Sequence, residues 1–120
     1  MFSKKKAQNT AYDEEILEYS TKRRELRDKI IAATQDVIVS KSVVDLFSPK
    51  EKQWNAASNK LILTKRRLIT LMEDYETVRE KYNTLTIENK DERISTKFYQ
   101  GNRESAQEIV RWAYRDFYRK

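Results

Sequence analysis

The chain has 120 residues, of which 37% are charged, and carries a formal net charge of +6. It contains neither cysteine nor histidine, which excludes disulfides and zinc sites built from thiolate or imidazole and removes the commonest general base. Glycine and proline occur once each, too rarely for a sheet protein, which needs a turn every few residues. This composition predicts an all-α fold built from long helices.

Residues 1–11 are predicted to form a flexible basic arm. They carry Lys4, Lys5 and Lys6, and no apolar run follows this cluster, so the segment lacks the pattern of a secretory signal. No apolar run in the chain approaches the ~20 residues that a membrane-spanning helix needs. We therefore expect a protein without a transmembrane segment, located in the cytoplasm. The three lysines are more typical of a solubilising tail than of a membrane or nucleic-acid arm.

Residues 12–47 are predicted to form a long helix with one apolar stripe. The stripe follows alternating spacings of four and three residues: Tyr12, Ile16, Tyr19, Arg23, Leu26, Ile30, Ala33, Val37, Ser40, Val44 and Phe47. Only Arg23 and Ser40 interrupt its apolar character, as expected for one face of a coiled-coil-like helix. The β-branched run at 36–44 weakens the helix propensity, so a strand there is the competing interpretation.

A turn near residue 48 is predicted to separate this helix from a second one. Ser48 suits the N-cap of a helix, Pro49 suits its first position, and Glu51 follows the cap by three residues, which is the pattern of a capping box. The second helix carries its own stripe at the same spacings: Trp54, Ala57, Leu61, Thr64, Leu68, Leu71, Tyr75, Val78, Tyr82 and Leu85. A short connection between helices of matched length predicts an antiparallel hairpin over 12–87.

The position of this turn predicts which residues of the two helices face each other. Facing residue numbers sum to about 98, which places Ile30 opposite Leu68. The basic segment around Arg23 would then face the acidic segment 73–76, with the Arg23 stem covering Tyr75 and its head reaching an acid. We expect charge matching there that selects the register more than it stabilises the hairpin.

The C-terminal part is predicted to hold one short helix. Residues 88–101 read as an irregular connector or a small β-hairpin. Gly101 breaks the pattern, and Asn102 suits the N-cap of a last helix over 102–120. The apolar face of this helix comprises Ala106, Ile109, Val110, Ala113 and Phe117. The fold class is therefore a long antiparallel helical hairpin plus a short helix, which can complete an irregular three-helix bundle.

The last helix carries the first candidate site, a set of aromatic and arginine side chains off its apolar face: Arg111, Trp112, Arg115 and Tyr118. These residue types are frequent at the energetic centres of protein interfaces, and they also stack on nucleic-acid bases. The competing interpretation is that Trp112 packs against the edge of the hairpin and has only a structural role. We predict that these residues bind a protein partner.

The second helix carries the second candidate site, a basic cluster that comprises Lys60, Lys65, Arg66 and Arg67. The segment expected to face it, 31–34, contains no acid, so these charges are the least neutralised of the hairpin. They predict phosphate or nucleic-acid binding through backbone contacts, because no motif for base readout is present. A solvated helix face is the simpler, competing interpretation.

These observations favour a non-enzymatic assembly or adaptor protein that acts through protein–protein contacts. A two-helix hairpin has a small core, which favours a protein partner or self-association into a homo-oligomer. An accessory nucleic-acid-binding protein is the alternative, and a carboxylate enzyme is least favoured. Adjacent acids such as Glu14 and Glu15 point ~100° apart on a helix and converge poorly on a metal or substrate. No catalytic residue, cofactor or metal site is predicted.

Overall fold

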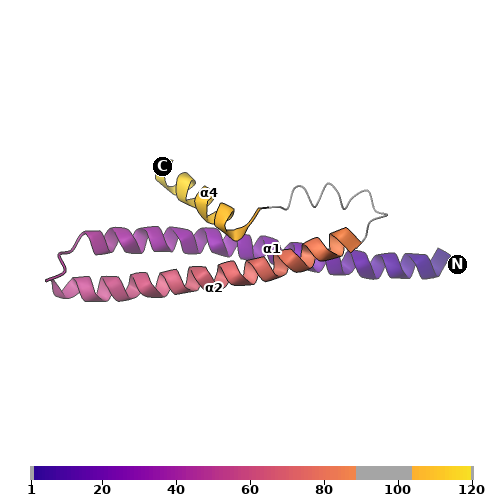
Figure 1. Cartoon of the computed structure of the whole chain (residues 1–120), viewed down its shortest axis with the longest axis horizontal. Coiled ribbons are helices and arrows are strands. Elements are labelled where there is room, and N and C mark those ends of the chain that lie inside the picture. Colours follow the sequence, from indigo (N-terminus) through magenta and orange to yellow (C-terminus); the bar gives the residue numbers. More distant parts are fainter. Residues whose placement is uncertain (1, 89–103, 120) are drawn as a thin grey trace.

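The computed structural model of the chain describes residues 2–88 and 104–119 (Figure 1). Within these residues the chain forms three helices and no strand: α1 (Phe2–Asp45), α2 (Lys52–Glu88) and α4 (Ala106–Arg119). The helices α1 and α2 lie side by side and antiparallel, and α4 packs across them, mainly on α1. The predicted all-α hairpin with a short third helix is confirmed. The prediction for 88–101 falls, apart from the last residue of α2, outside the described residues.

The first helix is longer than the sequence predicted. Because α1 begins at Phe2, residues 2–11 have a helical backbone where a flexible arm was expected. In Figure 1 this end of α1 projects beyond the last turn of α2. No glycine or proline precedes Pro49, and extending an existing helix costs little because its nucleus has already formed.

The β-branched run at 36–44 is helical, so the strand considered for it is wrong. Ile38 within this run is buried, and the Ser42 hydroxyl donates a hydrogen bond of 3.0 Å to its carbonyl. Burying one large apolar side chain contributes ~1.5–3 kcal/mol. That gain exceeds the ~0.5 kcal/mol by which a β-branched residue disfavours a helix.

The reversal between α1 and α2 occurs where the sequence predicted it, but the second helix begins later than Pro49. The amide of Glu51 donates to the Ser48 carbonyl (2.9 Å), which closes a β-turn with Pro49 at its second position. Helix α2 then starts at Lys52. The Ser48 hydroxyl makes no hydrogen bond within the described residues, so the predicted capping box is not formed. The fixed φ of proline fits this turn position as well as the first position of a helix.

The centre of the structure lies where all three helices meet. Ile30 of α1 and Tyr75 of α2 are fully buried and form one cluster with Ala106 and Ile109 of α4. Leu68 packs against this cluster, which agrees with the predicted pairing of Ile30 and Leu68. These contacts place both stripes of the hairpin at one interface and join α4 to it.

Arg23 is buried in the hairpin but does not contact the groups predicted for it. Only 8% of its surface is exposed, and its guanidinium carbon lies 5.4 Å from the ring centroid of Tyr82 rather than over Tyr75. Side chains on a helix lean toward the N-terminus of that helix, which carries the long Arg23 side chain toward the end of α2. Its Nε has no hydrogen-bond partner, and no acid of the described residues pairs with it.

The charge matching expected between this segment and residues 73–76 is absent from the described residues. Lys22 pairs instead with Glu18 of its own helix, at 3.0 Å. This hydrogen bond raises the pKa of the Lys22 ammonium above its ordinary value. The register of the hairpin therefore follows from its apolar contacts and not from ion pairs between its arms.

We expect Arg23→Met to raise the free energy of unfolding by ~1 kcal/mol, because it removes a buried charge that has no counterion within residues 2–88 and 104–119. Methionine is unbranched and fills a similar volume. Chemical denaturation followed by circular dichroism measures the effect, and the exposed Arg24→Met should stay within ~0.5 kcal/mol of wild type. A loss of more than ~1 kcal/mol in Arg23→Met would show that the contact with Tyr82 stabilises the fold.

Candidate functional site

The helix α4 begins with a capping box that the sequence analysis overlooked. The amide of Glu108 donates to the Ser105 hydroxyl (3.2 Å), and the amide of Ser105 donates to a Glu108 carboxylate oxygen (3.4 Å). The sequence Ser-Ala-Gln-Glu at 105–108 matches the capping-box pattern, so a local signal was present. The N-cap predicted at Asn102 lies outside the described residues, and Ser105 fills the role.

Helix α2 supplies a second cap for α4, through a carboxylate distant in sequence. Glu76 accepts a hydrogen bond from the amide of Ala106 (2.8 Å) with one oxygen and one from Arg79 (3.2 Å) with the other. The neighbouring Tyr75 hydroxyl donates to the Glu104 carbonyl (3.2 Å). A negative charge at the start of a helix is favoured by the helix dipole. Two adjacent residues of α2 thus hold the first turn of α4 in place.

The face of α4 toward the hairpin is the one that the sequence predicted. Ala106, Ile109 and Ala113 are buried, and Val110 and Phe117 are half-buried. The two alanines allow α4 to approach α1 closely. Trp112 lies outside this buried face, at the edge of α4 that runs along α1, and is partly exposed to solvent.

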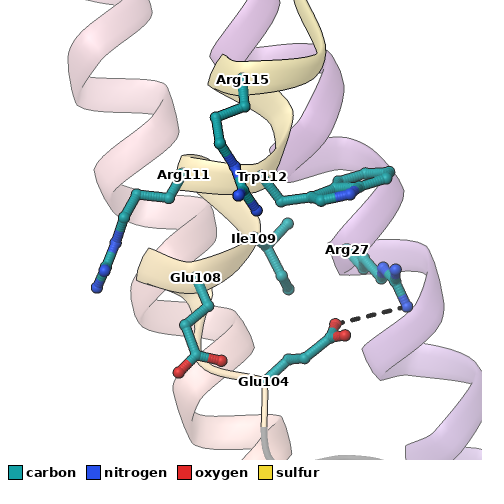
Figure 2. A pocket seen from close by; sticks show the side chains of 7 residues that line it. All are labelled: Arg27, Glu104, Glu108, Ile109, Arg111, Trp112 and Arg115. Carbon is teal, nitrogen blue, oxygen red and sulfur yellow. Dashed lines mark ion pairs between the residues drawn. The ribbon is translucent and has the colours of Figure 1, made fainter.

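A cleft of about 540 Å³ lies between this edge of α4 and α1 (Figure 2). Its lining residues are Arg27, Glu104, Glu108, Ile109, Arg111, Trp112 and Arg115. The guanidinium carbon of Arg27 lies 5.8 Å from the Trp112 ring centroid, within range of a cation–π contact. Arg27 also pairs with Glu104 at 3.7 Å. Trp112 stays 46% exposed, so it is held by α1 and still accessible.

The free charges of the cleft are positive. Arg111 and Arg115 are exposed and have no ion-pair partner among the described residues. The two acids are engaged, Glu104 with Arg27 and Glu108 with the amide of Ser105. In Figure 2 Trp112 points toward α1, and Arg111 points to the side of α2. Guanidinium groups beside an indole ring suit a ligand that combines a carboxylate with an apolar or aromatic group.

Tyr118 lies in a neighbouring groove of about 480 Å³, which Arg111 and Arg115 also line. Its hydroxyl donates to the Tyr114 hydroxyl (3.5 Å), and the two ring centroids are 5.0 Å apart. The hydrogen bond to Tyr114 raises the pKa of Tyr118 above its ordinary value. The structure thus brings Arg111, Trp112 and Arg115 into one cleft and places Tyr118 beside it.

The four residues of the basic cluster of α2 do not all line one cleft. Lys60 and Arg67 line a cleft of about 200 Å³ between the hairpin arms, together with Asp36. Lys65 and Arg66 are exposed but do not line it. The sequence analysis expected no acid opposite this cluster; Asp36 lies there because it follows the segment 31–34 by about half a helical turn.

Sequence reasoning missed the residues that position the candidate site, namely Arg27, Tyr75, Glu76 and Glu104.

Comparison of the chain with protein-family models, curated proteins and solved structures finds no significant match. Within residues 2–88 and 104–119, no acidic side chains gather in a group of three or more that could bind a metal ion. In the same residues, no helix is long and apolar enough to cross a membrane.

We expect Glu76→Ala to weaken the docking of α4 by ~1 kcal/mol, since it removes a helix cap. Amide hydrogen exchange should become faster over the first turn of α4. The emission of Trp112, read in a Trp54→Phe background, should shift to longer wavelength. Glu80→Ala is the matched control, because Glu80 is an exposed acid one turn further along α2. Equal exchange rates in Glu76→Ala and Glu80→Ala would contradict the role of Glu76.

Proposed function

We propose that the protein is a non-enzymatic helical assembly or adaptor protein that acts in the cytoplasm through protein–protein contacts. The observation that carries this proposal is the half-exposed indole of Trp112, held by Arg27 beside two arginines without ion-pair partners among the described residues. Tryptophan and arginine are the residue types that contribute most to binding at protein interfaces. The cleft suits a partner segment in which a carboxylate neighbours an apolar side chain.

The chemistry of the cleft supports binding rather than catalysis. Its unpaired groups are guanidinium groups, which donate hydrogen bonds and accept none. The two carboxylates are already engaged in an ion pair and in the helix cap. The groups of this cleft can therefore orient and hold a ligand, and none is poised to transfer a proton.

The thin core also supports a partner-binding role. In the isolated chain several residues of the predicted α2 stripe are only half-buried: Trp54, Leu61, Leu68, Leu71 and Val78. A contact that removes more of their surface from water would add stability in proportion to the apolar area covered.

Accessory nucleic-acid binding is the alternative function. One observation favours it: α2 has no acidic residue from Lys52 to Met72, and none of its four clustered cations has an ion-pair partner among the described residues. Lys60 and Arg67 share their cleft with the acidic side chain of Asp36, which repels a phosphate. We therefore rank this function second.

We expect Trp112→Ala to reduce the recovery of specific partners from an extract of the source cells by at least tenfold, since interface tryptophans often contribute ~2 kcal/mol or more. Leu17→Ala is the matched control, because Leu17 is an apolar residue of α1 with 64% of its surface exposed. Quantitative mass spectrometry of affinity-purified protein measures the recovery. If both variants capture the same proteins in the same yield, Trp112 is not the binding residue.

The alternative has its own test, which measures DNA and RNA binding by fluorescence anisotropy across salt concentration. If contacts are with phosphates, affinity must fall steeply with salt. Under the adaptor proposal, we expect no specific binding at about 0.15 M salt and no change in partner recovery after nuclease treatment. Binding at that salt that is lost in Lys65→Ala/Arg67→Ala would instead support the nucleic-acid function.

A further inference from the structure

The side of α2 that faces away from α1 carries an unpartnered stripe. Ile62, Arg66, Ile69 and Glu73 follow one another at spacings of four, three and four residues, so they lie along one face of the helix. Each of the four is exposed, with Ile62 at 46% and Ile69 at 54%. We call these four residues the α2 outer stripe. Neither α1 nor α4 covers it.

The charged groups of the α2 outer stripe are free to pair with another molecule. Neither Arg66 nor Glu73 has an ion-pair partner within residues 2–88 and 104–119. The hydroxyls of Thr70 and Thr77 do not pair with the Arg66 and Glu73 side chains, because they donate to backbone carbonyls of the same helix. Thr70 donates to the carbonyl of Arg66 and Thr77 to that of Glu73, both at 3.1 Å.

Charge along α2 is divided between its two halves. In the first half, from Lys52 to Met72, every charged side chain is positive. In the second half, from Glu73 to Glu88, most charged side chains are acids: Glu73, Asp74, Glu76, Glu80 and Glu88. Within the stripe, Arg66 belongs to the first half and Glu73 to the second, with Ile69 between them. A surface with both signs in this order is complementary to the same surface turned end to end.

We propose that two copies of the chain associate through the α2 outer stripe, with the two α2 helices antiparallel about a twofold axis close to Ile69. In this arrangement Arg66 lies opposite Glu73 of the second copy, and Glu73 lies opposite its Arg66. The two Ile69 side chains meet at the axis and bury their apolar surface there. The contact is isologous, because each copy offers the same patch to the other.

The charge order of the stripe favours a second copy over a partner whose charge is of one sign. A partner with charge of one sign would be attracted by one end of the stripe and repelled by the other. A parallel arrangement of two copies would place Arg66 against Arg66 and Glu73 against Glu73, which is unfavourable for both pairs. Only the antiparallel pair matches both ends of the stripe.

This dimer surface is separate from the Trp112 cleft. The cleft lies between α4 and α1, whereas the stripe lies on α2 and faces away from α1. Dimerisation therefore does not depend on the function proposed for the cleft, and each can fail without the other. The α2 outer stripe is thus a second interaction surface, and its partner is a second copy of the chain.

A charge exchange tests the arrangement. Analytical ultracentrifugation of the full chain over a wide range of protein concentration gives the dimer dissociation constant. We expect a concentration-dependent dimer for wild type. Arg66→Glu and Glu73→Arg should each weaken it at least tenfold, since either change sets like charges against each other at two places. The double variant Arg66→Glu/Glu73→Arg should dimerise again to within a few fold of wild type, because both pairs are restored with their signs exchanged.

Replacing the apolar Ile69 with a polar residue tests the contact at the twofold axis. Ile69→Ser should weaken the dimer at least tenfold, whereas Val39→Ser, at a residue of α1 with 51% exposure, should leave it unchanged. The helix content of wild type and of every variant is measured by circular dichroism, which separates loss of association from loss of fold. Trp112→Ala should dimerise as wild type does.

Two results would overturn the proposal. The first is a wild-type chain that remains monomeric at every concentration. The second is a dimer that both single charge variants weaken but the double variant does not recover, because that outcome removes the reciprocal pairing of Arg66 with Glu73.

Discussion

The hydrogen bond between the Glu76 carboxylate and the first amide of α4 ties the start of α4 to helix α2. It fixes where α4 begins on the hairpin, and the Tyr75 hydroxyl reinforces it through the Glu104 carbonyl. From this start Ala106, Ile109 and Ala113 follow into the buried interface. In this position of α4, Trp112 lies beside Arg27, and the cleft forms between them and the start of α4.

The hairpin and the buried face of α4 were predictable because their apolar residues recur at regular spacings along the chain. Residues that contact one neighbouring helix recur every three or four positions, and a short connection between two such stripes allows little besides an antiparallel pair. The start of α2 was misjudged because Pro49 fits a β-turn as well as a helix start. Ser105 and Glu108 had a readable capping pattern. Glu76 had none, because its partner is distant in sequence.

Arg23 shows how a correct location can accompany a wrong contact. Its place on the stripe predicted that it would be buried, and it is. Its partner depended on the direction of a long side chain, which leads to Tyr82 and away from the acids of 73–76. The cleft at α4 likewise contains a contact that the spacing of residues in one helix does not predict. Spacing placed Trp112 beside Arg115 on one edge of α4 and Arg111 near Tyr118 on the other, whereas Arg27 comes from α1 and enters the cleft only through folding.

Helix α4 occupies one position on the hairpin and thereby forms the cleft. Spin labels on cysteines introduced at the exposed positions Asp28 of α1 and Gln107 of α4 test it directly, since the chain has no cysteine of its own. Pulsed electron–electron double resonance then measures the distance between them. A docked α4 predicts a single narrow distance distribution, and a broad distribution, as for a helix attached only through its connecting segment, would contradict the account.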